Sequence, residues 1–169
     1  STKDKRLINF IEMLKEMEGK DKKFSGGGER VVEGKYINIP KYLVREFCEI
    51  IKNHRVYLNE GFFYRPVGTE ILQQAPPIDF DLKTIKDSYV LKSSGGMPVV
   101  LGCKNDVFLY GTIIYLPEYQ FCYKISPYLQ VFNEAKVVTI SNLEEENILR
   151  RLIPDLNLLS NNVTLSKSI

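Results

Sequence analysis

The sequence predicts an α+β domain in which helices pack on one side and at both ends of a mainly antiparallel or mixed sheet of about five to seven strands. Two apolar runs, 97–103 and 107–116, flank the polar turn Lys104-Asn105-Asp106, an arrangement typical of neighbouring strands at the centre of a sheet. Apolar residues recur at three- and four-residue spacing near the N-terminus and again after Pro40, which indicates two amphipathic helices. The expected strands are grouped in hairpins, and the expected helices lie at the ends of the chain and in one crossover. This order therefore predicts the α+β class.

In chain order, the expected organisation begins with an amphipathic helix over 1–19. Three consecutive glycines then predict a flexible loop over 20–30, because regular structure would cost them too much backbone entropy. We expect the α+β core over 31–155 and an irregular tail, rich in Asn and Ser, over 156–169.

Runs of apolar and aromatic residues bounded by turn residues predict the remaining strands. We expect strands at 31–39, 55–58, 62–65, 89–92, 119–125 and 136–140. We expect the strands at 55–58 and 62–65 to form a hairpin, because Gly61 supplies the conformational freedom that a short connection needs. The segment 128–132 reads as either a strand or a turn of helix.

Helix signals are strongest near the C-terminus. Ser141 and Glu144 form a capping box, Arg150 and Arg151 suit the negative end, and Pro154 predicts the stop. The other helical segments follow Pro40 over 43–51, cover 69–74 before Pro76-Pro77, and form one turn at 82–86.

Composition excludes several classes of protein. The 23 basic and 21 acidic residues nearly balance, so any affinity for nucleic acid must come from a local patch. No apolar run approaches the roughly 18 residues of a membrane span, and we expect no membrane partner. Cys48, Cys103 and Cys122 have no CxxC spacing and lie in apolar runs, which predicts reduced core residues in a cytoplasmic or nuclear protein.

Two carboxylates, Asp79 and Asp81, lie one residue apart and would point to the same side of an extended strand. Paired carboxylates of this kind hold Mg²⁺ or Mn²⁺ in phosphoryl-transfer enzymes, with Asp106 or Asp87 as the nearest third ligand. The competing interpretation is that Asp81 caps a helix and Asp79 occupies a turn after two prolines. We expect no resident cofactor unless the metal-enzyme alternative holds.

Two glycine loops have N–H groups open enough to cradle a phosphate. The first contains Gly26-Gly27-Gly28 and the second is Ser93-Ser94-Gly95-Gly96, next to Lys92. Neither has the spacing of a P-loop or of a dinucleotide fingerprint, so flexible connection is the competing interpretation.

Aromatic and basic residues are interleaved on several predicted strands, as in Lys35-Tyr36, Arg55-Val56-Tyr57 and Tyr123-Lys124. Exposed rings flanked by cations hold unpaired bases by stacking. Aromatic residues are also ordinary strand formers, which is the competing interpretation. The only histidine, His54, follows a helix, where the helix dipole favours an imidazolium.

The leading hypothesis is a non-catalytic binding module, one part of a larger protein or complex, that recognises a nucleotide or single-stranded nucleic acid. Its candidate ligand-binding residues are Tyr36, Phe62, Tyr64, Arg65, Lys92, Ser94, Gly95, Gly96, Lys104, Tyr123 and Lys124. One alternative is a protein-interaction domain that docks a protein partner through its N-terminal helix or a sheet edge. The other is a divalent-metal phosphoryl-transfer enzyme that uses Asp79 and Asp81.

Overall fold

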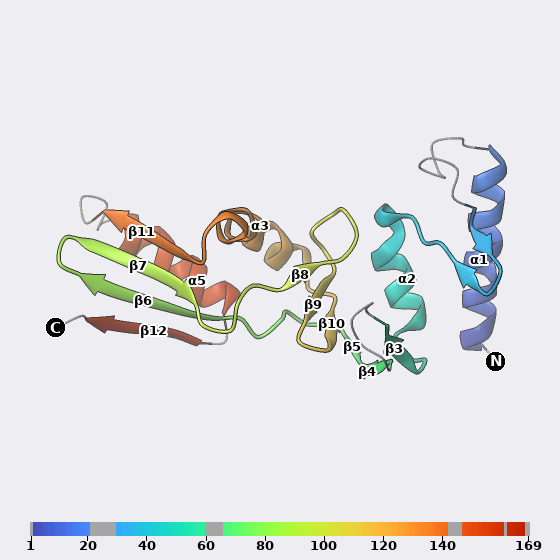
Figure 1. Cartoon of the computed structure of the whole chain (residues 1–169), viewed down its shortest axis with the longest axis horizontal. Coiled ribbons are helices and arrows are strands. Elements are labelled where there is room, and N and C mark those ends of the chain that lie inside the picture. The colour runs from blue at the N-terminus through green and yellow to red at the C-terminus, as the bar shows by residue number, and fades with distance from the viewer. Residues whose placement is uncertain (1, 21–29, 60–65, 142–146, 161, 168–169) are drawn as a thin grey trace. The chain divides into compact units, whose positions relative to one another are not determined.

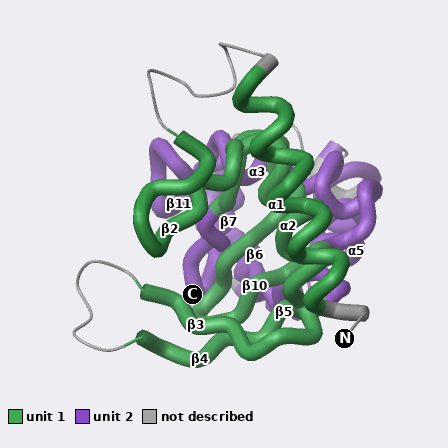
Figure 2. Tube along the Cα trace, turned by 90° about the vertical axis from the view of Figure 1, so that its right-hand side faces the viewer, with its two compact units in different colours: residues 1–72, 100–116 green, residues 73–99, 117–169 purple. Residues whose placement is uncertain are grey.

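The computed structural model describes residues 2–20, 30–59, 66–141, 147–160 and 162–167. Helices combine there with mainly antiparallel strands, so the predicted α+β class is confirmed (Figure 1). The chain divides into two compact units, coloured separately in Figure 2: unit 1 comprises residues 1–72 and 100–116, and unit 2 comprises residues 73–99 and 117–169. Among the helices of these described ranges, none has the length and apolar character needed to cross a membrane.

Helices form the first half of unit 1. They are α1 (Thr2–Lys20), the 3-10 turn η1 (Lys41–Leu43) and α2 (Val44–Ile51). Phe10 and Leu14 of α1 are buried in the cluster that also contains Leu43, and the ring centroids of Phe10 and Phe47 lie 5.9 Å apart. Both predicted amphipathic helices are confirmed, and the apolar face of α1 is covered by its own chain.

A tight hairpin precedes η1. Its strands are β1 (Val32–Glu33) and β2 (Tyr36–Ile37), which pair antiparallel. The expectation of one continuous strand over 31–39 is wrong, because the chain reverses at Gly34. This residue has φ of +59°, a conformation that glycine adopts without the steric cost other residues meet.

Strands form the second half of unit 1. Strands β3 (Val56–Leu58) and β4 (Val67–Thr69) pair antiparallel. A separate mixed sheet has the order β5-β10-β9-β8, and its strands are β5 (Ile71–Leu72), β8 (Val99–Val100), β9 (Phe108–Tyr110) and β10 (Ile113–Tyr115). The chain passes from unit 2 to unit 1 within β8 (Val99–Val100). Buried Ile71, Val107 and Leu116 share a core with Cys48 of α2.

Three local predictions change in unit 1. β3 pairs with residues 67–69, while the expected partner at 62–65 lies outside the described residues. The short helix expected at 69–74 is wrong, because Ile71 and Leu72 pair with β10 instead. The run 107–116 is a hairpin and not one strand, because it turns at Gly111 with φ of +63°.

Unit 2 contains a four-stranded sheet within its described residues, of order β11-β7-β6-β12. The strands are β6 (Asp79–Ile85), β7 (Ser88–Ser93), β11 (Val137–Ser141) and β12 (Asn162–Lys167), and only the β6–β12 pair is parallel. Phe80 and Leu82 are buried at alternate positions of β6, which makes the expected helical turn at 82–86 wrong.

Helices cover the Phe80 face of this sheet. They are α3 (Tyr119–Glu134), the π-helical turn η3 (Ile148–Leu152) and α5 (Ile153–Leu159). The ring of Phe80 lies 6.0 Å from that of Tyr128 and 6.3 Å from that of Phe132, centroid to centroid. The strand expected at 119–125 is therefore wrong: Phe121 and Ile125 are buried at helical spacing.

The C-terminal segment is regular, against expectation. The helix continues past Pro154, which lies in the first turn of α5, where its missing N–H is tolerated. Leu156 and Leu159 are buried, and residues 162–167 then pair with β6. Of the predicted capping box, Ser141 belongs to β11 and Glu144 lies outside the described residues.

Candidate functional site

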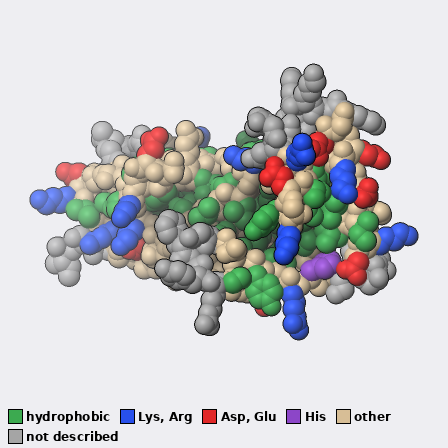
Figure 3. All heavy atoms as spheres, turned by 45° about the vertical axis from the view of Figure 1, so that its right-hand side comes forward, with side chains coloured by type: hydrophobic (Ala, Val, Ile, Leu, Met, Phe, Trp, Pro, Cys, Tyr) green, Lys and Arg blue, Asp and Glu red, His purple; other side chains and the backbone are tan. Residues whose placement is uncertain are grey.

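Charged side chains of both signs lie on the face drawn in Figure 3. Figure 3 shows basic and acidic side chains interspersed on one face, in keeping with a formal net charge of +2. A binding site in this chain must therefore be built from a local arrangement of shape and charge, and not from a broad basic surface.

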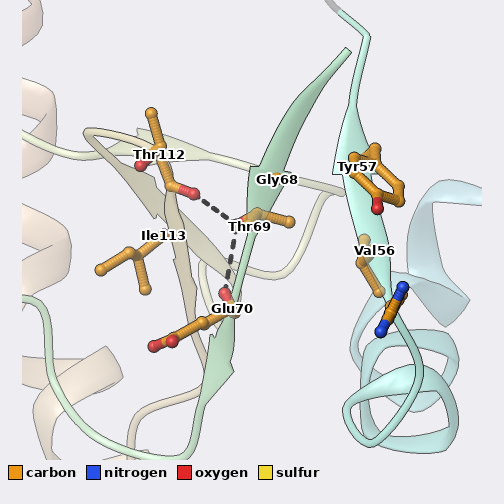
Figure 4. Close-up of a pocket in the computed structure, with 8 residues that line it drawn as sticks. Val56, Tyr57, Gly68, Thr69, Glu70, Thr112 and Ile113 are labelled. Atoms are coloured by element: carbon orange, nitrogen blue, oxygen red, sulfur yellow. Dashed lines mark hydrogen bonds between the residues drawn. The ribbon is translucent and has the colours of Figure 1, made fainter.

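A hollow with a volume of about 460 Å³ lies in unit 1 (Figure 4). Its lining includes Arg55 and Tyr57 from the β3 side, Gly68, Thr69 and Glu70 from the β4 side, and Thr112 from the turn between β9 and β10. We refer to this hollow as the β3–β4 groove.

Strand geometry places three polar or aromatic side chains on one face of the β3–β4 pair. Tyr57 is the cross-strand partner of Gly68. Because side chains alternate along a strand, Arg55 shares the face of Tyr57, and Glu70 shares the face of Gly68. Val56 points to the opposite face and packs against the core of unit 1. The core contact therefore fixes which way Arg55 and Tyr57 point.

Gly68 leaves room beside the Tyr57 ring. The ring is 59% exposed, and a Cβ at residue 68 would lie 4.0 Å from Tyr57 Cε1. An exposed ring that borders a position without a side chain presents an open aromatic face. Such a face is the surface on which planar ligands stack.

Hydrogen bonds hold the wall of the groove. The Thr69 hydroxyl donates to the carbonyl oxygen of Thr112, and it also lies 3.2 Å from the carbonyl oxygen of Glu70 (Figure 4). The Ile114 N–H donates to the same Glu70 oxygen at 2.9 Å. Thr69 and Glu70 are thus tied to Thr112 and to Ile114 of β10, respectively.

The charged groups of the groove are available to a ligand. Within the described parts of the chain, the side chains of Arg55, Tyr57 and Glu70 form no hydrogen bond or ion pair with one another or with other described residues. A cation, an anion and an open ring in one hollow can together hold a planar, charged ligand.

The candidate residues in unit 1 do not join this groove. Tyr36 of β2 is 76% exposed and Lys104 is exposed in the loop before β9, but neither lines it. Phe62, Tyr64 and Arg65 lie outside the described residues, as do the three glycines of the first loop.

The candidates in unit 2 divide between the two sides of its sheet. Tyr123 of α3 is 81% exposed, and Lys124 forms an ion pair with Asp155 at 3.2 Å. α3 packs on the Phe80 face, whereas Lys92 alternates with the Leu91 side chain and points to the opposite face. Lys92 and Tyr123 therefore belong to different surfaces of unit 2.

The second glycine loop uses much of its own hydrogen-bonding capacity. The Ser93 hydroxyl donates to the Gly96 carbonyl at 2.8 Å, and the Gly96 N–H donates to the Ser93 carbonyl at 3.3 Å. The Ser94 N–H donates to the Asp79 carbonyl at 3.0 Å. These two N–H groups are already occupied within unit 2, so they are not open to a phosphate.

The carboxylate candidates lack a third ligand. Asp79 and Asp81 share one face of β6, and Asp81 is the cross-strand partner of Lys92. Asp106 belongs to unit 1, where its carbonyl accepts a 2.6 Å hydrogen bond from Arg45. In the described part of the chain, no group of three or more His, Cys, Asp or Glu side chains could hold a metal ion.

The cysteines differ from one another. Cys48 and Cys122 are buried as expected, whereas Cys103 is exposed, so its assignment to the core is wrong. Burial, followed by the nearby charge of Glu49, raises the pKa of the Cys48 thiol to about 11. Cys48 is therefore a poor nucleophile. His54 lies instead against α1, with Nε2 3.5 Å from Asp4 Oδ1.

Sequence reasoning found only part of the groove. The interleaved Arg55 and Tyr57 are visible in the sequence. Thr69 and Glu70 lie in the helix expected at 69–74, Gly68 lies just before it, and Thr112 lies in a strand that was expected to be continuous. The β-branched residues Val67, Thr69 and Ile71 at alternate positions are the local signal that could have suggested strands there.

Comparison with known proteins adds one match. A protein-family model described as "Bacterial SNF2 helicase associated" matches residues 35–169, a range that contains the β3–β4 groove and most of both units. No curated protein matches the chain, and no solved structure does. The matched range is well over half of the sequence, so the chain belongs to the family of bacterial SNF2 helicase-associated domains.

Proposed function

We propose that this chain is a non-catalytic module of a larger protein or complex, which binds single-stranded nucleic acid in the β3–β4 groove beside a SNF2 helicase. The observation that carries the proposal is the exposed Tyr57 ring next to Gly68, with Arg55 unpaired among the described residues. The family description supports a nucleic-acid context, because it associates the domain with a helicase.

The proposal assigns a role to each group. An unpaired base stacks on Tyr57, where stacking contributes roughly 1–3 kcal/mol per base. The Arg55 guanidinium contacts the adjoining phosphate, because it keeps its charge and offers several donors. A base paired in a duplex cannot present its face to the ring, so the groove favours single strands.

The two alternatives receive less support. The apolar face of α1 is occupied by Phe10 and Leu14, which pack within unit 1, so that face is not open to a protein partner. Phosphoryl transfer through Asp79 and Asp81 would need a further ligand, which the described residues do not bring to them.

The test is binding of labelled 12-nucleotide single strands of DNA and RNA, and of the matching duplex, followed by fluorescence anisotropy at low salt. We expect Tyr57→Leu to weaken single-strand binding by about fivefold or more, because it removes a stacking face. Gly68→Val adds bulk beside the ring and also weakens binding, while valine suits a strand position.

Tyr36→Leu is the matched control, because Tyr36 is an exposed strand tyrosine of the same unit outside the groove. We expect it to bind like the wild type. Equal losses in Tyr36→Leu and Tyr57→Leu would remove the groove from the proposal. A protein concentration of about 100 µM is at least about four decades above the dissociation constant of a typical specific complex. Absence of binding at that concentration would discard the function itself.

A further inference from the structure

The helix α3 has a second apolar face. Its inward face carries Phe121 and Ile125, which are buried in unit 2. On the outward face, Tyr119 and Tyr123 lie one helical turn apart and are 78% and 81% exposed, and Val131 further along is 44% exposed. A helix with apolar residues all round its surface is normally covered on every side. We infer that the outward face of α3 docks on the SNF2 helicase that this module accompanies.

The outward face of α3 carries little charge. Its exposed apolar and aromatic residues follow one another at four-residue spacing, and we call them the α3 stripe: Tyr119, Tyr123, Pro127 and Val131. From residue 119 to residue 133 the sequence contains one charged residue, Lys124, which pairs with Asp155 at 3.2 Å. By contrast, α1 exposes Lys5, Glu12 and Lys15. Depletion of charge and enrichment in tyrosine are typical of the centre of a protein–protein interface.

The α3 stripe suits a protein and not a nucleic acid. Phosphates are held by cations, and the ammonium group of α3, on Lys124, is already committed to Asp155. Exposed carboxylates flank the stripe, Glu118 before its first residue and Glu134 after its last. The complementary surface on the helicase is therefore apolar at its centre and basic at its rim.

The size of the α3 stripe favours a partner within one larger protein over a second copy of this chain. α3 has 16 residues, so a strip about 10 Å wide along its length of about 24 Å covers roughly 240 Å². A stable complex of separate proteins buries about 800 Å² on each partner. A small interface holds when its two sides are linked, because their effective concentration is then about millimolar.

The family description supplies the identity of the linked partner, because it associates this domain with an SNF2 helicase. The inference therefore rests on the helicase context of the proposed function. It does not depend on the β3–β4 groove, which belongs to unit 1, whereas α3 belongs to unit 2.

The test is maleimide labelling of Gln130→Cys in a Cys103→Ser background, for the chain alone and for the chain joined to the SNF2 helicase that it accompanies. Gln130 is exposed on α3, whereas Cys48 and Cys122 are buried. We expect the helicase to slow labelling of the peptide that contains residue 130 by about fivefold or more, because the thiol reacts only in the undocked form. Tyr36→Cys, an exposed site on β2, is the matched reporter, and its rate should stay unchanged.

A second substitution tests the α3 stripe itself. Tyr123→Glu places a charge where docking would bury it without a partner. Because Tyr123 is 81% exposed, we expect the variant to fold normally. Residue 130 should then label as fast beside the helicase as in the chain alone, whereas Tyr123→Phe should keep the protection. Protection that persists in Tyr123→Glu would overturn the assignment of the stripe as the docking face.

The other outcomes separate this inference from the proposed function. Equal labelling of residue 130 with and without the helicase would overturn docking and leave single-strand binding to its own test at Tyr57. Equal protection of residues 130 and 36, or protection of residue 130 by single strands alone, would overturn docking as well. Slow labelling already in the chain alone would show that the stripe is covered, with the same result. Tyr57→Leu should weaken single-strand binding without changing the protection of residue 130.

Discussion

Cysteine chemistry at the residue scale distinguishes the three thiols of this chain. The thiolate is the reactive form, so burial and a raised pKa protect Cys48. Cys122 is also buried, and its Sγ lies 3.9 Å from the Pro117 carbonyl. Cys103 is exposed.

We therefore predict that Ellman's reagent at pH 8 modifies one thiol per native chain rapidly. Cys103→Ser should remove this fast phase, and the two remaining thiols should react only after denaturant is added. A fast reaction of two or more thiols in the folded protein would contradict the burial of Cys48 and Cys122.

Tyr128 gives a prediction about alkaline stability. Burial, followed by the charge of Asp155, raises the pKa of its phenol to about 12. The phenol is neutral when protonated, so the stabilisation is complete below the unfolded pKa near 10 and is lost as pH rises toward 12. Between these values, the free energy of unfolding should fall by up to about 1.4 kcal/mol per pH unit from this group.

Tyr128→Phe keeps the ring that packs 6.0 Å from Phe80 and removes the ionisation. Urea unfolding of both proteins at pH 8 and pH 11 measures the difference. We expect the variant to lose less stability over this range than the wild type. An equal decline in the two proteins would show that Tyr128 does not contribute to it.

At the scale of elements, the helix α1 tests how unit 1 holds together. Leu14 is fully buried, and truncation of a buried leucine costs roughly 2–5 kcal/mol. We predict that Leu14→Ala lowers the free energy of unfolding by about 2–4 kcal/mol, measured by urea denaturation.

Ile8→Ala is the matched control, because Ile8 lies on the same helix and is 57% exposed. Its effect should remain within about 0.5 kcal/mol. A loss in Leu14→Ala no larger than that of the control would mean that α1 does not pack stably on α2. In that case α1 would regain its candidacy as a docking helix for a partner.

Most elements whose apolar residues follow a single periodicity, that of a helix or that of a strand, were predictable from the sequence. α1 and α2 follow their apolar spacing, and β7 and β11 lie within a residue or two of their expected ranges. α3 was not predicted because its aromatic residues favour strand and Pro127 disfavours a helix interior, although Phe121, Ile125 and Phe132 follow helical spacing.

Elements that depend on pairing across the sequence were not predictable. β12 is polar and partly exposed, and becomes a strand because β6 provides its hydrogen-bonding partner. The β3–β4 groove likewise depends on contacts between residues that are distant in the sequence. Arg55 and Tyr57 are readable as a pattern, but the pairing of Tyr57 with Gly68, and of Thr69 with Thr112, joins residues that local propensity does not connect.

At the scale of the whole molecule, the near balance of charge limits how nucleic acid can be held. A chain of formal charge +2, with acidic and basic groups interspersed, exerts little long-range attraction on a polyanion. Affinity must come mostly from stacking and from the few cations at the site. This distinguishes the proposed module from one that coats nucleic acid with a basic surface.

The salt dependence of binding measures that difference. For a single strand, the slope of log K against log salt is about −0.7 for each phosphate neutralised. With Arg55 as the principal cation, we predict a slope of about −0.7 to −1.4, so that affinity falls about 5- to 25-fold between 20 and 200 mM salt. Arg55→Gln should make the slope shallower by about 0.7. Lys104 is a cation of the same unit outside the groove, so Lys104→Gln should leave the slope unchanged.

A slope steeper than about −3 would require several phosphate contacts at once. The interface would then extend beyond the described lining of the β3–β4 groove, in which Arg55 is the one basic side chain.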